Sequence, residues 1–140
     1  MSVLVVGTND VTHVTPPATL ARVWRELLDA LASLDAPVVV SSLPEFRVMR
    51  LLPHPLMDAA LGYGRLVGAV QDRSAASRAG VSLVDVRRAV GGEFVTRRDL
   101  MSVDSFHPSA AGYGRIADAL TPAVVAAAGI PGAGRRRDAS

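Results

Sequence analysis

The chain of 140 residues contains no cysteine and no lysine, and only 4% of its residues are aromatic. Without cysteine there is no disulfide, no thiol nucleophile and no cysteine-ligated zinc. The scarcity of aromatic side chains argues against a base-stacking platform for single-stranded nucleic acid. These absences narrow the classes of function that are open to the chain.

The chain also lacks a large excess of positive or negative charge. All fifteen basic residues are arginine, and thirteen acidic residues bring the formal net charge to +2. The one dense basic cluster is Arg135–Arg137, inside a glycine-containing terminal stretch. A basic run at a chain end is more typical of a solvated tail than of a nucleic-acid contact. We therefore expect one domain over residues 1–131, a disordered Arg-rich tail over residues 132–140, and no nucleic-acid partner.

Long apolar runs are missing as well. None approaches the roughly 20 residues of a membrane span, and residues 1–15 lack the basic and apolar regions of a secretion signal. Hydrophobic residues nevertheless make up 49% of the chain and charged residues 20%, which is typical of a globular domain with one core. We expect no membrane span. The location expected for the chain as printed is cytoplasmic, unless a segment is missing from its N-terminus.

Strand and helix patterns alternate along the chain. The apolar run Val3–Val6 is typical of a buried parallel strand, and similar runs occur at Val38–Val40 and Val81–Val86. After Thr15-Pro16-Pro17, with Thr15 as a candidate cap, apolar residues recur at helical spacing in one stripe. The stripe consists of Leu20, Val23, Trp24, Leu27, Leu28, Leu31 and Leu34. This order predicts a parallel sheet with helices on its faces.

The remaining segments complete this prediction. Glu45–Pro55 contains prolines and irregular charge and predicts a loop, and a helix follows from Leu56 to Arg78. Gly91-Gly92 and the charged residues after it predict a loop behind the third strand. The last helix is expected from Pro108 to about Ala128, with Pro122 dividing or kinking it.

Two polar clusters are expected at the carboxyl edge of the sheet, where such folds bind ligands. In the second, Asp104 precedes His107 by three residues. A loop this short can bring the carboxylate to the Nδ1–H of the imidazole, which leaves Nε2 free as a general base. Pro108 would stiffen the junction with the next helix, and Ser109 could cap that helix. A helix-entry loop with a surface histidine fits the same residues, so both interpretations stay open.

The first cluster is Gly7-Thr8-Asn9-Asp10, directly after the first strand. Gly7 permits a tight turn close to a ligand. The side-chain amide of Asn9 can donate a hydrogen bond to a developing oxyanion, and Asp10 could cap or brace the turn. An ordinary turn at a strand end would use the same residue types.

Metal and nucleotide chemistry find little support. His13, His54 and His107 fall on separate predicted elements and lack the spacing of a metal site. A phosphate-binding glycine-rich loop between a strand and a helix is missing too, which disfavours a nucleotide-binding flavodoxin-like domain. We expect no metal and no cofactor, and we interpret Asp85 as a structural hydrogen-bonding residue.

Taken together, the two clusters resemble motifs of the SGNH (GDSL-type) hydrolases, a family of ester hydrolases with a flavodoxin-like three-layer α/β fold. One block of the family reads Gly-x-Asn-Asp, as at Gly7–Asp10, and its last block reads Asp-x-x-His-Pro, as at Asp104–Pro108. Gly112-Tyr113 and Leu43-Pro44 also fit the family pattern. The resemblance implies this fold over nearly the whole chain, truncated at the N-terminus to about three strands.

The resemblance also implies a role for each matching residue. His107 would be the general base, Asp104 its orienting partner and Asn9 the oxyanion donor, with Gly7 and Asp10 in the supporting turn. The implied activity is hydrolysis of a small-molecule, lipid or carbohydrate ester by Ser-His-Asp chemistry, without a cofactor.

The nucleophile of that chemistry is absent from the chain. The family carries it in a Gly-Asp-Ser block that precedes the Gly-x-Asn-Asp block, and no Gly-Asp-Ser occurs among the 140 residues. Ser2 stands at the wrong end of its strand, and nothing marks Ser41 or Ser42 as a replacement. The chain is therefore expected to be an N-terminally truncated esterase, inactive by itself.

A second hypothesis is a non-catalytic remnant or accessory module. By the resemblance, Val3–Val6 would be a central strand whose neighbour is missing, so an apolar edge would be exposed. A partner chain that completes the sheet would cover this edge.

Overall fold

The computed structural model describes residues 1–43 and 56–130, so the predicted loop Glu45–Pro55 and the predicted tail 132–140 lie outside the described residues. The described strands are β1 (Ser2–Leu4), β2 (Val38–Ser41) and β3 (Val81–Val84). They form one parallel sheet in the order β1-β2-β3. In its register, Ser2 lies opposite Val38, which lies opposite Val81. The predicted α/β class with a parallel sheet is confirmed.

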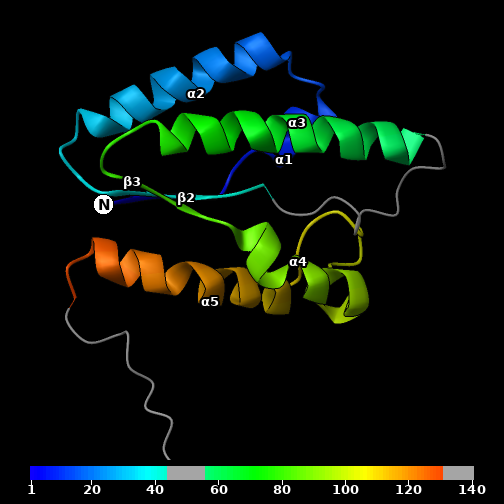
Figure 1. Cartoon of the computed structure of the whole chain (residues 1–140). Coiled ribbons are helices and arrows are strands. Elements are labelled where there is room, and N and C mark those ends of the chain that lie inside the picture. Colours follow the sequence, from blue (N-terminus) through cyan, green and yellow to red (C-terminus); the bar gives the residue numbers. More distant parts are fainter. Residues whose placement is uncertain (44–55, 131–140) are drawn as a thin grey trace, which may run out of the picture.

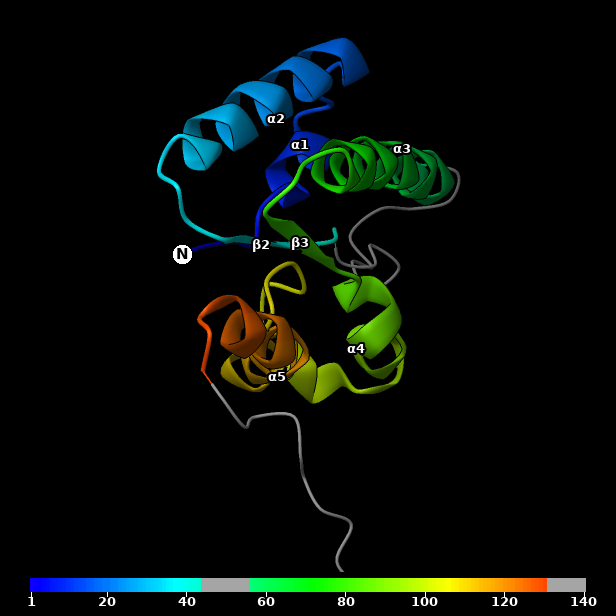
Figure 2. The same cartoon turned by 60° about the vertical axis from the view of Figure 1, so that its left-hand side comes forward.

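Helices cover both faces of this sheet. The described helices are α1 (Thr8–Thr12), α2 (Pro17–Ala32), α3 (Leu56–Ala76), α4 (Val86–Thr96), the 3-10 helix η2 (Arg98–Leu100) and α5 (Ala110–Ala127). Figures 1 and 2 show α1, α2 and α3 on one face of the sheet and α4 and α5 on the other. The described residues therefore form three layers, as predicted.

The core has two parts because β2 sends alternate side chains to opposite faces. Val38 and Val40 pack with Trp24 and other residues of α2 and α3, whereas Val39 packs with residues of α4 and α5. All three valines are at most 2% exposed. Burial of such a side chain stabilises the fold by roughly 2 kcal/mol, so β2 anchors both helical layers.

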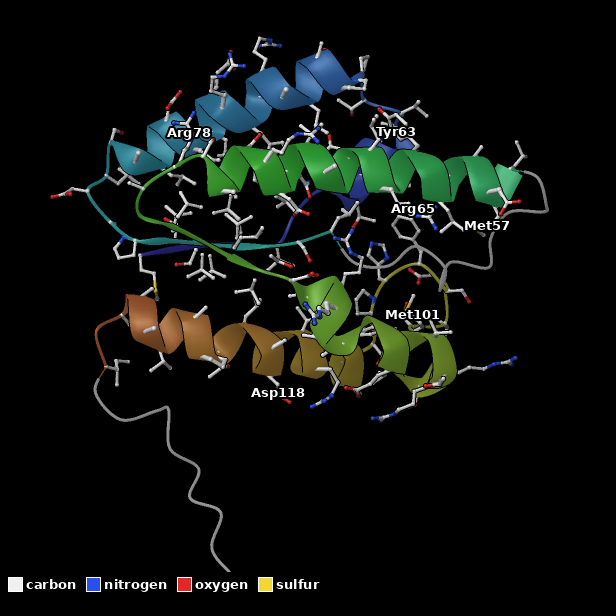
Figure 3. All side chains as sticks on the ribbon, viewed as in Figure 1. Met57, Tyr63, Arg65, Arg78, Met101 and Asp118 are labelled. Atoms are coloured by element: carbon white, nitrogen blue, oxygen red, sulfur yellow. The ribbon has the colours of Figure 1, made fainter. Side chains whose placement is uncertain are left out.

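Only one side of the apolar stripe on α2 is buried. Leu20, Trp24 and Leu28 are at most 3% exposed and belong to the core, which confirms the packing role of Trp24. The prediction was wrong for Val23, Leu27 and Leu34, which are 45%, 36% and 64% exposed, and Leu34 lies beyond the end of the helix. In the described residues α2 packs chiefly on α3, and a single neighbouring helix covers a narrow face. At the far end of this contact, Arg78 pairs with Asp29 of α2 (Figure 3).

Helix α4 was missed by the sequence prediction, which placed a loop at Gly91-Gly92 and extended the third strand to Val86. The strand ends at Val84, and Asp85 caps α4 by accepting a hydrogen bond from the backbone N–H of Arg88 at 3.0 Å. Val86 and Val90 lie four residues apart on the buried face. Burial of this face outweighs the cost of glycine, about 1 kcal/mol per residue. The prediction was wrong because it considered only the low helix propensity of the two glycines.

Two further details of the helices differ from the prediction. Pro122 lies inside α5 and does not divide it, which contradicts one of the two outcomes expected for this proline. The carbonyl group that lacks an N–H partner belongs to Asp118, which is exposed, so water can satisfy it. At the start of α2 the N-cap residue is Pro16 without a side-chain cap, so Thr15 does not cap this helix.

Strand β1 lies at an edge of the sheet that the described residues form. It ends at Leu4, two residues before the predicted end. Val3, Val5 and Val6 are 45%, 46% and 51% exposed. Full burial, as in a central strand, is therefore absent here, and the exposed apolar edge that the second hypothesis expected is present.

Candidate active site

The polar clusters predicted at the carboxyl edge of the sheet meet in one cavity. Its volume is about 280 Å³, and both Asn9 and His107 line it. Gly7 and the serines that end β2 contribute further polar groups, and apolar side chains from α4, α5 and the segment between them complete the walls. Met101 belongs to that segment (Figure 3). The cavity lies beyond the carboxyl ends of the strands, where ligands of parallel sheets bind.

His107 and Asp104 form a hydrogen-bonded pair at the rim of this cavity. Nδ1 of His107 lies 2.7 Å from Oδ2 of Asp104, the contact expected from their spacing. Their side chains are 60% and 48% exposed. A carboxylate at Nδ1 favours the tautomer with the proton on that nitrogen, so Nε2 keeps a lone pair.

The other oxygen of Asp104 is held by three donors. Oδ1 accepts hydrogen bonds from the hydroxyl of Ser102, from the backbone N–H of Phe106 at 2.9 Å and from that of His107 at 3.0 Å. The His107 imidazole, followed by Ser102 and the two backbone groups, holds the pKa of Asp104 well below its usual range. The carboxylate is therefore charged wherever His107 could act as a base.

The loop that carries this pair is closed at its base. Met101 and Pro108 form an isolated antiparallel bridge, and the backbone N–H of Ser102 donates to the carbonyl of His107 at 2.9 Å. Ser109 accepts a hydrogen bond from the N–H of Gly112 at 3.2 Å. Ser109 therefore caps α5, as predicted.

Gly112 allows α5 to start directly against this loop. A Cβ atom at Gly112 would lie 2.1 Å from the carbonyl oxygen of Leu100. Real side chains do not approach a backbone oxygen so closely, so the position requires glycine. The close approach fixes the start of α5 behind the loop.

The Asn9 side of the cavity is built differently. Gly7 has φ 122°, a conformation that residues with a side chain rarely adopt, and it precedes the short helix α1. Asn9 is exposed, and its backbone carbonyl accepts from the N–H of His13 at 2.9 Å. Asp10 lies in the first turn of α1. Sequence reasoning predicted a plain turn here and missed the helix.

Gln71 supports this turn from α3, and sequence reasoning missed it. Its side chain is fully buried, and Nε2 donates to the carbonyl of Val6 at 3.4 Å. A Cβ atom at Gly7 would lie 2.0 Å from this Nε2 atom. The one signal in the sequence is the position of Gln71 four residues after Val67, on the buried face of α3.

The serines at the end of β2 line the cavity, but their hydroxyl groups are engaged. Ser41 donates to the carbonyl of Ser42 at 2.9 Å. Ser42 donates to Asp85 at 3.2 Å and accepts from the backbone N–H of Arg87 at 3.3 Å. Asp85 thus has the structural hydrogen-bonding contacts expected from the sequence.

Arg87 brings a positive charge to the cavity wall. Its Nη2 lies 3.5 Å from Oδ2 of Asp72. Burial raises the pKa of Asp72, with a further increase from the charge of Asp85, while Arg87 opposes the rise. The pair places an ionic contact between α3 and α4 next to the cavity.

Residues 1–43 and 56–130 offer neither a metal-binding cluster nor a membrane-spanning helix. Within these ranges no three His, Cys, Asp or Glu side chains gather as a metal ion would need. In the same part of the chain, no helix combines the length and the apolar character that crossing a bilayer requires.

Comparison with known proteins gives consistent matches. The model of the GDSL-like lipase/acylhydrolase family matches residues 2–115. The GDSL-like esterase Rv1075c of Mycobacterium tuberculosis is 31% identical over 120 residues, which are 85% of this chain and 38% of that protein.

A solved structure shares the fold. It comes from Streptococcus pneumonia, and its protein is provisionally described as a platelet activating factor. The TM-score is 0.58 at 17% identity, over 87% of this chain and 58% of the other. The chain thus spans less than two thirds of the length of each of these two proteins.

Proposed function

The chain belongs to the GDSL-like lipase/acylhydrolase family, and on that premise we propose that its cavity serves the hydrolysis of a small-molecule ester. His107 acts as general base, Asp104 orients it, and Asn9 donates to the oxyanion. The observation that carries this proposal is the 2.7 Å contact between His107 and Asp104 at a cavity that Asn9 also lines. Gly7 and Asp10 belong to the turn that presents Asn9.

The proposed reaction proceeds through an acyl-enzyme. A serine hydroxyl attacks the ester carbonyl while Nε2 of His107 takes its proton, and the Asn9 amide stabilises the oxyanion. The C–O bond to the alcohol then breaks, and His107 returns the proton to the leaving alkoxide. Water then attacks the acyl carbon while His107 takes its proton, the bond to the serine oxygen breaks, and His107 returns the proton to that oxygen as the acid leaves.

The serine of this reaction lies outside the 140 residues in our proposal. The chain contains no Gly-Asp-Ser. The hydroxyl groups of Ser41 and Ser42 are engaged in hydrogen bonds, and both residues are only 2% exposed. The chain alone is therefore expected to hydrolyse p-nitrophenyl acetate negligibly and to resist labelling by a fluorophosphonate.

Reconstitution tests the proposal. The part of the Mycobacterium tuberculosis relative outside the matched 120 residues is co-expressed with this chain, and ester hydrolysis is measured. We expect activity that His107→Ala abolishes and that Asn9→Ala lowers by roughly 10²–10³, the usual effect of losing an oxyanion donor.

Asp104→Asn tests the orienting carboxylate, and Asp118→Asn is its matched control. Asp118 also pairs with a cation on the surface of α5, Arg115 at 2.9 Å, whereas Asp104 pairs with His107, which lines the cavity. Only Asp104→Asn should lower the rate. Turnover by the unaided chain, or reconstituted turnover that survives His107→Ala, would contradict the assignment.

The exposed edge of β1 favours a second candidate function, a non-catalytic module that pairs with a strand of a partner chain. Val3, in the middle of this strand, is 45% exposed. Unpaired strand edges with apolar side chains tend to associate. A partner strand here would extend the sheet without using the cavity.

Light scattering during size-exclusion chromatography tests this candidate. The chain is expected to elute as an assembly, and Val3→Lys should shift it toward the monomer, since an edge lysine opposes pairing. Val95→Lys is the control, because Val95 is 51% exposed on α4 in the other layer. A monomer at every concentration counts against the partner strand.

A further inference from the structure

Ser102 touches both members of the pair through different groups. Its hydroxyl donates to Oδ1 of Asp104. Its backbone N–H donates to the carbonyl oxygen of His107 at 2.9 Å. One residue thus fixes the carboxylate and closes the backbone of the loop.

The two oxygens of Asp104 have separate tasks. Oδ1 takes the Ser102 hydroxyl and the backbone N–H groups of Phe106 and His107, while Oδ2 is left for the imidazole at 2.7 Å. Of the three groups on Oδ1, Ser102 supplies the one side chain. It alone can be removed by substitution without touching the backbone.

The donors that hold the Asp104 carboxylate matter because the Asp104–His107 pair is open to solvent. With side chains 48% and 60% exposed, water competes for both partners, and an exposed ion pair gains little by itself. A carboxylate held by several donors loses less freedom when it binds the imidazole. The orientation of His107 then depends on those donors.

From this geometry we infer that Ser102 is a positioning residue of the Asp104–His107 pair, whose hydroxyl turns Oδ2 of the carboxylate toward the imidazole. The inference rests on the proposed function for its effect on catalysis. The hydrogen bond from the Ser102 hydroxyl to the Asp104 carboxylate does not depend on that function and can be measured without turnover.

The test compares Ser102→Ala, which removes the hydroxyl and keeps the backbone contacts, with Ser102→Thr, which keeps a hydroxyl. The carboxyl ¹³C signal of Asp104 is titrated by NMR in the full chain. Loss of a donor to the charged form should raise the pKa of Asp104 by up to roughly one pH unit, a tenfold change in proton affinity. Threonine should restore the midpoint of the native chain.

Ser105→Asn is the matched control inside the same loop. Ser105 has φ 54°, which asparagine tolerates, and its backbone N–H bonds to the carbonyl of Ser102 at 3.0 Å. This variant should titrate like the native chain. Urea unfolding of each variant confirms that the titrations compare folded proteins.

Reconstituted hydrolysis gives the second readout. Ser102→Ala should lower kcat roughly tenfold with little change in KM, because the base is misaligned while ester binding is untouched. An unchanged Asp104 midpoint in Ser102→Ala overturns the inference. A raised midpoint without any reconstituted activity supports the role of Ser102 and contradicts the proposed ester hydrolysis. Failure of the inference and failure of the proposed function can therefore be distinguished.

Discussion

The loop with Asp104 and His107 is held by contacts made within residues 99–112, whereas the turn with Asn9 combines local hydrogen bonds with support from a side chain distant in sequence. In the loop, hydrogen bonds join residues at most ten positions apart. At the turn, Gln71 of α3 reaches the carbonyl of Val6, 65 positions away in sequence. Both regions line the same cavity, yet the loop is held by contacts that are local in sequence, whereas the turn also needs a tertiary contact.

The candidate site therefore has two halves, the histidine loop and the turn with Asn9, and each half needs different parts of the fold in place before it can form. Closing a short loop costs little chain entropy, so the histidine loop can form once η2 and α5 are placed. The turn at Gly7 needs α3 docked on the sheet before Gln71 can support it. Each half contains one glycine without room for a side chain, Gly112 in the first and Gly7 in the second, so matched substitutions can test the difference.

The largest effect is expected for Gly112→Ala in the local half. The new Cβ would meet the Leu100 carbonyl oxygen at 2.1 Å, and a backbone atom in a bridged loop cannot step aside. Overpacking of this kind costs about 3 kcal/mol, far more than any gain in helix propensity at this position. Urea unfolding should show the loss in free energy of unfolding.

Gly114→Ala is the control, two residues further along α5. A Cβ there meets nothing within 4 Å, so alanine should stabilise the helix by up to about 1 kcal/mol. Opposite signs at neighbouring glycines would confirm that the contact with Leu100, and not helix propensity, decides the outcome. Equal effects would break the account of the loop.

Gly7→Ala tests the tertiary half and should cost somewhat less, about 2 kcal/mol. Part of the cost is the backbone strain at φ 122°, typically 1–3 kcal/mol. The remainder is the clash with Nε2 of Gln71, which lies at the end of a flexible side chain and can move. The free energy of unfolding measures the sum.

A double variant divides that sum. Gly7→Ala combined with Gln71→Ala removes the clash and leaves the strain, so the two substitutions should be non-additive. Gly80→Ala isolates strain elsewhere, because Gly80 has φ 76° and open space around a Cβ. Strict additivity of the pair would show that Gln71 does not support the turn.

The same contrast explains what the sequence could predict. The Asp104–His107 contact and the Ser109 cap join residues three positions apart, and the expected strand and helix order placed the two clusters at one edge. Gln71 beneath Gly7 has no local signature. The carboxylate contact of Ser102 was within reach, since it joins residues two positions apart, but Ser-x-Asp is too common to single out.

Elements were misjudged where tertiary burial overrides local preference. Gly91-Gly92 indicated a loop, but the buried Val86 and Val90 make α4 a helix. The α2 stripe predicted more buried residues than one neighbouring helix can cover, so Leu27 stays 36% exposed. Periodicity marks an apolar face without telling how much of it a neighbour covers.

The smallest effect on stability is expected for Asp104→Asn, because the pair is largely exposed. Its value lies in its pH dependence. The His107 imidazole first, then Ser102 and the backbone donors, hold the pKa of Asp104 below its usual range in the folded chain. In the unfolded chain the carboxyl group titrates near the ordinary value of about 3.9.

The sign of the effect follows from linkage. A carboxyl group with a depressed pKa in the folded state contributes stability above its unfolded pKa, and this contribution is lost as pH falls through the folded value. The native chain and Asp104→Asn should therefore differ most in urea midpoint near pH 7 and less at pH 3. A difference that stays constant with pH would mean that the local donors do not hold the charged carboxylate. The local half of the site would then lose the feature that sets it apart from the turn at Gly7.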